Sequence, residues 1–99
     1  MMMILMRQKI ENEQINKLPE QWKNLAMCES SLNPTAENPS GKYMGLFQFS
    51  QDSWEFVGMT GTPLQASVKE QYAAARVLKA IQGWNAWPQC SRKLGYIND

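Results

Sequence analysis

The chain has 99 residues, 43% of them hydrophobic and 19% charged, which fits one domain with a limited core. Ten basic and nine acidic residues give a formal net charge of +1, so no strongly basic surface supports a nucleic-acid partner. Histidine is absent, which excludes Ser-His and Cys-His nucleophile systems and the usual zinc ligands, so proton transfer must rely on carboxylates.

Residues 1–6 are all apolar, and residues 8–17 are mostly polar with weak periodicity. The apolar run is shorter than the roughly 7–15 residues of a signal-peptide core, and no stretch reaches the roughly 20 of a membrane helix. We therefore expect no signal peptide and no membrane span. A domain boundary, or export by phage lysis or virion assembly, would account for such a start. We assign residues 1–18 to a partly helical N-terminal leader.

The first clear helix is predicted to begin at Pro19, a residue type that suits the first helical position. Trp22, Leu25, Ala26 and Glu29 then follow at the spacing of one helix face. A carboxylate therefore shares the apolar stripe, at the C-terminal end of the helix. Two interpretations remain open: a solvated carboxylate at the rim, or an acid whose pKa is raised by apolar surroundings and which can protonate a leaving oxygen.

Residues 30–44 carry two Asn-Pro pairs and one Ser-Gly pair, which are turn signals, and they are predicted to form a loop. Residues 45–49 are short and mostly apolar, and both a brief strand and a tight turn fit them. Ser50 is expected to cap a short helix that carries Trp54. Residues 58–63 form a second predicted loop.

The strongest predicted helix spans about residues 68–82. Ser67 and Glu70 have the spacing of a capping box, and Gly83 is placed to end the helix. One apolar stripe is expected on this helix, with Ile81 close beside it: Val68, Tyr72, Ala75 and Leu78.

The two cysteines, Cys28 and Cys90, lie near the two ends of the folded part. Two buried free thiols and one disulfide both fit this spacing. A disulfide that closes so long a loop would stabilise the fold by roughly 4 kcal/mol in the chain-entropy model. The nearby Trp84 and Trp87 are assigned to the core rather than to a ligand.

Several short motifs occur along the chain in a fixed order. Those resembling the lytic transglycosylases of the lysozyme-like fold are Glu29-Ser30, Asn33-Pro34, Gly41 and Gly45-Leu46-Phe47-Gln48. Those resembling the actinobacterial resuscitation-promoting factors, which match more closely, are Trp22 to Ser30, Phe49 to Trp54 and Gln82 to Ser91. The resemblance covers about residues 20–95. One departure is Lys42-Tyr43-Met44, which is one residue longer than either pattern.

The resemblance implies an α+β, mainly α, lysozyme-like domain over residues 19–95, with a substrate groove and a short tail at 96–99. Cys28 and Cys90 match the positions that form a disulfide in the resuscitation-promoting factors, so the resemblance favours one disulfide. Such a bond would anchor the residue next to Glu29.

The resemblance also implies that Glu29 is the catalytic acid. The substrate would be the β-1,4 bond between N-acetylmuramic acid and N-acetylglucosamine in peptidoglycan. Glu29 would protonate the glycosidic oxygen and then act as a base toward water or the sugar's own 6-hydroxyl. No second carboxylate is required in that scheme, and Asp52 and Glu55 are assigned to the surface.

Four further residues are expected to bind substrate. Gln48 matches a groove glutamine that orients sugar groups, with a buried amide bonded to the loop backbone as the alternative. Tyr43 is expected to stack on a sugar face. Asn38 lies near a polar position of the family. Trp54 is included among the groove residues, although a core position is the favoured interpretation.

The predicted function is therefore that of a peptidoglycan lytic transglycosylase or lysozyme-type glycosidase. A catalytically silent wall-binding or signalling domain is the alternative, and a cytosolic helical adaptor with two free thiols is a third. We expect glycan strands as the partner, with no nucleic acid, cofactor or metal, and a monomer. The expected location is extracellular at the cell wall, or virion-associated if a phage encodes the chain.

Overall fold

A computed structural model of the chain describes residues 2–97, with side chains from residue 6 onward. That range contains five α-helices and two 3-10 helices: α1 (Met2–Asn16), α2 (Glu20–Ser30), α3 (Gln51–Phe56), η1 (Pro63–Gln65), α4 (Val68–Gln82), η2 (Gly83–Ala86) and α5 (Pro88–Leu94). Extended pairing within it is limited to isolated antiparallel bridges from Met44 to Glu37 and Phe49. The mainly helical fold class is therefore confirmed. None of the helices in this range is long and apolar enough to cross a membrane.

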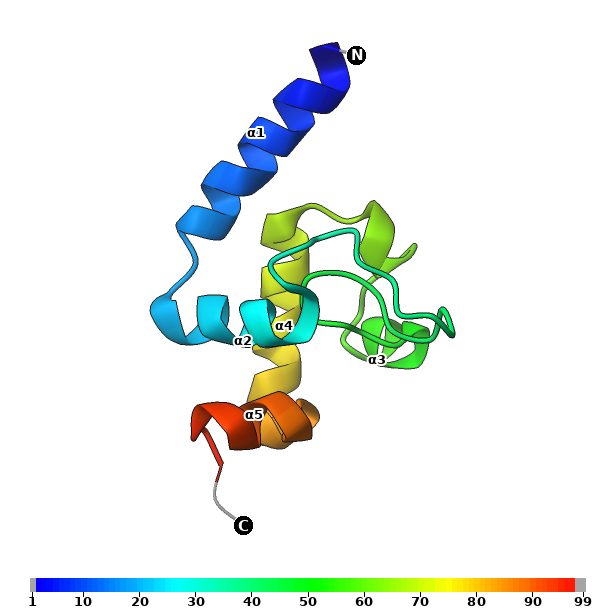
Figure 1. Ribbon diagram of the computed structural model, residues 1–99. Helices are drawn as coiled ribbons and strands as arrows, with labels where there is room; N and C mark the ends of the chain where they lie inside the picture. The colour runs from blue at the N-terminus through cyan, green and yellow to red at the C-terminus, as the bar shows by residue number, and fades with distance from the viewer. Residues whose placement is uncertain (1, 98–99) are drawn as a thin grey trace.

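Helix α4 runs through the centre of the molecule, with α2 across it and α5 at its C-terminal end (Figure 1). It has the predicted bounds because its ends are locally encoded. Ser67 and Glu70 form the capping box at its start, and Gly83 follows its last residue with a positive φ of 71°. The apolar stripe ends at Leu78, since Ile81 is 56% exposed and lies outside the core.

The centre of the core is a group of aromatic rings around Trp22 of α2. The Trp22 ring lies 5.8 Å from Phe47, 5.6 Å from Tyr72, 4.8 Å from Trp84 and 5.7 Å from Trp87, measured between centroids. Large rings supply much apolar area per residue, which suits a small core. Trp84 and Trp87 belong to this core, as predicted.

The N-terminal leader differs from its prediction, because α1 is helical from Met2 to Asn16 rather than in part. Its residues are good helix formers, and Arg7 pairs with Glu11 one turn later at 3.0 Å. The helix extends away from the body (Figure 1) and contacts it through its C-terminal end, where Ile15 and the following Leu18 are buried. Its sequence lacks a clear apolar stripe, which is why its extent was underestimated.

The C-terminal helix α5 was not predicted. Its buried residues are the adjacent Cys90 and Ser91, which do not give a helical stripe. Beyond it, Tyr96 of the predicted tail packs on Trp84, and its hydroxyl donates a hydrogen bond to the Gln21 carbonyl. The last two residues of that tail, 98 and 99, lie outside the described range.

Candidate active site

Helix α2 carries Glu29 in its last turn. Pro19 directly precedes the helix instead of occupying its first position, and Trp22 and Leu25 bury the face that Glu29 continues. Ser31 then ends the helix in the left-handed conformation, with φ at 57°. Glu29 is half-buried, so it is neither a freely solvated rim residue nor a core residue.

A cleft of about 380 Å³ opens beside this carboxylate. It is lined by Glu29, Tyr43, Gln48, Ala86, Trp87, Pro88 and Gln89. Three of the predicted site residues, Glu29, Tyr43 and Gln48, therefore meet in one cleft although they come from α2 and the following loop. Asp52 and Glu55 are exposed and do not line it, so Glu29 is the only carboxylate among the described residues that does.

The cleft changes the proton affinity of Glu29. Burial raises the pKa of Glu29 to about 7, and the positive charge of Lys93 opposes this rise. The carboxyl group is also in the last turn of α2, where the helix dipole disfavours a negative charge. A carboxylic acid with such a pKa is substantially protonated at neutral pH and can lose and regain its proton within one reaction cycle.

The Gly45–Phe49 segment is a tight turn, not a strand. Met44 and Phe49 exchange two backbone hydrogen bonds of 2.9 and 2.8 Å, and the Gln48 N–H donates to Gly45 O at 3.2 Å. Gln48 has a positive φ of 52° at the end of this turn. A left-handed conformation is unusual for a side-chain-bearing residue and is found where the surroundings enforce it.

The side chain of Gln48 combines both predicted interpretations. Its Nε2 donates to Gly45 O at 2.9 Å and to Ala36 O at 3.3 Å, so the NH₂ group is held by the loop backbone. The residue nevertheless lines the cleft, and its Oε1 accepts no hydrogen bond from any residue in the described range. The oxygen is therefore left as an acceptor for a ligand.

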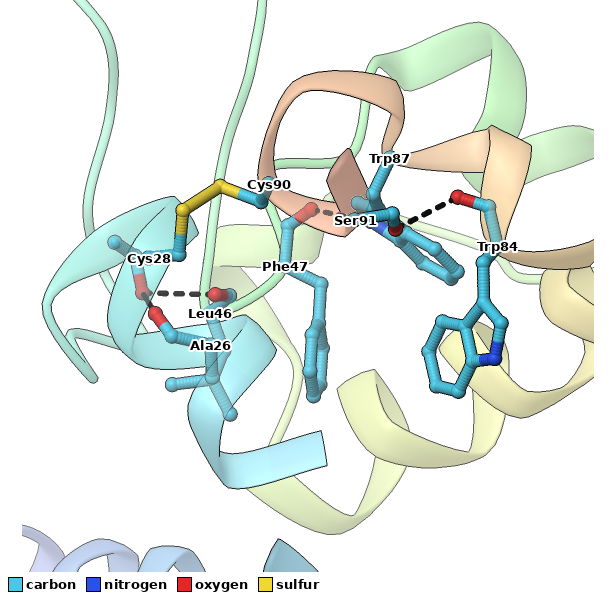
Figure 2. Close-up of a disulfide and its surroundings, with 9 residues drawn as sticks. Ala26, Cys28, Leu46, Phe47, Trp84, Trp87, Cys90 and Ser91 are labelled. Atoms are coloured by element: carbon cyan, nitrogen blue, oxygen red, sulfur yellow. Dashed lines mark hydrogen bonds between the residues drawn. A yellow bond between two sulfur atoms is a disulfide. The ribbon is translucent and has the colours of Figure 1, made fainter. Parts of the chain in front are cut away.

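Three side chains hold the backbone of this turn against the helices. The Ser30 hydroxyl donates to Leu46 O at 2.7 Å, and the Leu46 N–H donates to Gln71 Oε1 at 2.7 Å. The Trp87 indole N–H donates to Phe47 O at 3.0 Å, as Figure 2 shows. Because these groups come from α2, α4 and the start of α5, they fix the position of Gln48 relative to Glu29.

Gln71 is a residue that sequence reasoning missed. It is completely buried, and its Nε2 donates to Pro34 O at 3.0 Å and to Ala66 O at 3.2 Å. It lies three residues after Val68, on the buried stripe of α4. A polar residue on an apolar stripe was the signal that identified Glu29, and the same signal applied to α4 would have found Gln71.

Gly45 must lack a side chain for this arrangement to form. A Cβ on Gly45 would lie 2.5 Å from Gln71 Oε1, and the φ of 85° disfavours any other residue there. The close approach lets the buried amide reach the next peptide unit, Leu46 N–H.

A disulfide joins Cys28 of α2 to Cys90 of α5, with the two Cα atoms 5.9 Å apart. It confirms the pairing that the resemblance implied. Figure 2 shows the bond between the two helices, beside the Phe47 and Trp87 contact. Since Cys28 precedes Glu29 and Cys90 follows Gln89, the bond fixes two residues that line the cleft.

Two of the predicted substrate-binding residues lie elsewhere. Trp54 is fully buried, packs on Phe49, and donates its indole N–H to Thr60 O at 3.1 Å, so it belongs to the core and its assignment to the groove lining was wrong. Asn38 does not line the cleft. Its Oδ1 accepts from the Tyr43 N–H at 3.0 Å, which closes the loop that carries Tyr43.

Residues 17–90 match the transglycosylase-like domain family. Over 74 residues, which are 75% of this chain, 47% are identical to resuscitation-promoting factor Rpf of Micrococcus luteus. Over a stretch of the same length, 42% are identical to RpfC of Mycobacterium tuberculosis. Rpf1 of Corynebacterium glutamicum is 42% identical over 77 residues. The matched part covers 33%, 52% and 39% of these three proteins, so the chain corresponds to a third to a half of their length.

Proposed function

The chain belongs to the transglycosylase-like domain family and carries the domain found in resuscitation-promoting factors, and from that membership we propose that it cleaves the glycan strands of peptidoglycan. The bond cut would be the β-1,4 link between N-acetylmuramic acid and N-acetylglucosamine. One observation carries the proposal: a half-buried Glu29, with a pKa raised to about 7 by burial, lines a cleft together with Tyr43 and Gln48.

In the proposed mechanism Glu29 acts alone. Its protonated carboxyl group donates the proton to the glycosidic oxygen while the bond to the anomeric carbon breaks and an oxocarbenium-like state develops. The resulting carboxylate then accepts a proton from the nucleophile that attacks the anomeric carbon. Water would give a reducing end, and the 6-hydroxyl of the same sugar would give a 1,6-anhydro ring.

The other cleft residues would bind and orient the sugar. Gln48 Oε1 is a free acceptor for a sugar hydroxyl or amide N–H. Tyr43 is 41% exposed and offers a ring for stacking, with the Lys42 ammonium group 5.5 Å from its centroid. We assign Tyr43 and Gln48 to substrate binding and leave Asn38 with the support of the loop.

The disulfide supports an oxidising environment for the mature protein, because such bonds form and persist outside the reducing cytoplasm. We propose that the domain acts at the cell wall, where peptidoglycan is found. A cystine between α2 and α5 also argues against the adaptor with two free thiols.

The test uses purified peptidoglycan and the variant Glu29→Gln, which preserves the shape of the side chain and removes its acidic proton. The wild type is expected to release muropeptides and the variant to release none above background. Mass spectrometry of the products separates the two nucleophiles, because an anhydro end weighs one water less than a reducing end. Wall binding without release by the wild type would instead support a silent binding domain.

A further inference from the structure

The wall of the cleft formed by residues 86–89 contains a polar group that the mechanism above does not use. Ala86 and Pro88 offer no polar side-chain atom, and the indole N–H of Trp87 is already bonded to Phe47 O. Gln89 lines the same cleft, is exposed, and makes no side-chain hydrogen bond within the described residues. Its amide is therefore the one free polar side chain on this wall, among the residues that the structure describes.

Gln89 is also held in a fixed relation to the catalytic acid. It directly precedes Cys90, and Glu29 directly follows Cys28, so both residues adjoin the same disulfide. The two Cα atoms of the bridged cysteines are 5.9 Å apart. Gln89 and Glu29 therefore line one cleft, and the covalent link between their neighbours limits how far the two residues can separate.

The free donors of the cleft are few. The NH₂ group of Gln48 and the N–H of Trp87 are both bonded to backbone carbonyls. Apart from Glu29 itself, whose proton is used in the proposed reaction, this leaves the Tyr43 hydroxyl and the Gln89 amide as side-chain donors toward a ligand in the cleft. A carbonyl group of the substrate that becomes shielded from water in the cleft needs such a donor, since a buried polar group without a hydrogen-bond partner loses free energy.

We propose that Gln89 is a substrate-binding residue that recognises the N-acetyl group of the sugar bound next to Glu29. This assignment rests on the proposed function, which makes the ligand an N-acetylated glycan. A primary amide has a donor and an acceptor, and an N-acetyl group has the same two. The two groups can therefore form two hydrogen bonds, one in each direction. Because the amide is neutral, it binds the sugar without adding a charge beside Glu29.

The experiment measures binding without turnover, in the Glu29→Gln background. Gln89→Leu, which has a similar size and no polar atom, is compared with the parent and with Gln21→Leu. Gln21 is an exposed glutamine of α2 that does not line the cleft, so it is the matched control. Each protein is titrated onto insoluble peptidoglycan and onto the same wall after enzymatic removal of the N-acetyl groups.

Gln89→Leu is expected to weaken binding to the N-acetylated wall by about two- to tenfold for each hydrogen bond lost, and to leave binding to the deacetylated wall unchanged. Gln21→Leu should match the parent on both walls. Treating the deacetylated peptidoglycan with acetic anhydride restores its acetyl groups, and it should also restore the difference in affinity between Gln89→Leu and the parent. Melting curves of the three proteins show that the variants are folded.

The assignment would be overturned if Gln89→Leu and the parent bound equally to both peptidoglycan preparations. It would also be overturned if Gln89→Leu lost the same amount of affinity for both preparations. These outcomes are separate from a failure of the proposed function. If the enzyme with Glu29 intact releases no muropeptide while the N-acetyl-dependent loss is present, the catalytic proposal fails and the recognition by Gln89 stands.

Discussion

The two walls of the cleft are held by different forces. One wall consists of the end of α2 and the start of α5, which the Cys28–Cys90 disulfide joins covalently. The other is the Gly45–Phe49 turn, whose backbone is fixed by hydrogen bonds with the side chains of Ser30, Gln71 and Trp87. A cross-link stabilises mainly by restricting the unfolded chain, whereas buried hydrogen bonds act within the folded state. We therefore expect the first wall to control stability and the second to control the geometry around Gln48.

The largest effect on stability should come from breaking the disulfide that joins α2 to α5. Reduction of the disulfide, or the double variant Cys28→Ser with Cys90→Ser, is expected to lower the free energy of unfolding by roughly 2–5 kcal/mol and the melting temperature by at least several degrees. Thermal melting with and without reductant measures the loss. The double variant is the control, since reductant should not change its melting temperature. If reductant left the melting temperature of the wild type unchanged, the disulfide would not control the stability of the protein.

The hydrogen-bonded wall is tested by Gln71→Leu. The substitution leaves Leu46 N–H and the Pro34 and Ala66 carbonyls without their partner, and we expect a loss of about 2–3 kcal/mol. Urea denaturation measures it, with Gln21→Leu as the control, which should change stability by less than about 0.5 kcal/mol.

The same variant separates geometry from stability. Assayed well below its melting temperature, Gln71→Leu should have a higher KM for glycan strands, because the turn that carries Gln48 is no longer fixed. A KM equal to that of the wild type at a temperature where both are folded would show that the turn keeps its shape without Gln71.

The free energy of unfolding should also depend on Glu29 and on pH. The pKa of Glu29 is about 7 in the folded protein and about 4.3 in an unfolded chain, so the folded state binds more protons between these values. Stability is therefore highest below the unfolded pKa and falls as the pH rises through 7. Glu29→Gln removes this penalty and should stabilise the protein by about 1–2 kcal/mol at pH 8, after allowing for partial exposure, and not at pH 4. Denaturation at the two pH values tests this, and an equal change at both would contradict it.

The smallest effect concerns Lys93, which lies in the last turn of α5 and whose positive charge lowers the pKa of Glu29. Lys93→Met should raise the pKa further. Because the proposed reaction needs protonated Glu29, the alkaline limit of the pH–activity profile should move to higher pH. Lys9→Met, which changes an exposed lysine of α1, is the control and should leave the profile in place.

Local signals explain which parts of the fold could be predicted. The bounds of α4 follow from its capping box and terminal glycine, and Ser50 caps α3 by accepting from the Ser53 N–H, as expected. Helices α1 and α5 could not be predicted with their full extent because neither has an apolar stripe. Helix α1 forms through local helix propensity, and α5 forms through contacts with residues that are distant in the sequence. In α5 these contacts are the disulfide together with Ser91, whose hydroxyl donates to Trp84 O at 2.8 Å.

The site shows the same limit. Glu29, Tyr43 and Gln48 could be identified from motifs, and the structure brings them into one cleft. For Trp54 the sequence favoured the core but left the groove open, because an aromatic residue in a short helix fits either position until its burial is known. Gln89 has no motif of its own, and only the packing of α5 beside α2 reveals that it reaches the cleft.

Gly45 and Gln71 compete for one small volume, and this has an evolutionary consequence. An alanine at position 45 would collide with the amide oxygen, and its backbone would be strained at a φ of 85°. A shorter residue at position 71 would relieve the collision, yet it would leave the Leu46 N–H unpaired. Neither residue can be replaced before the other without destabilising the fold. Libraries randomised at both positions should therefore return the Gly–Gln combination far more often than independent sampling predicts.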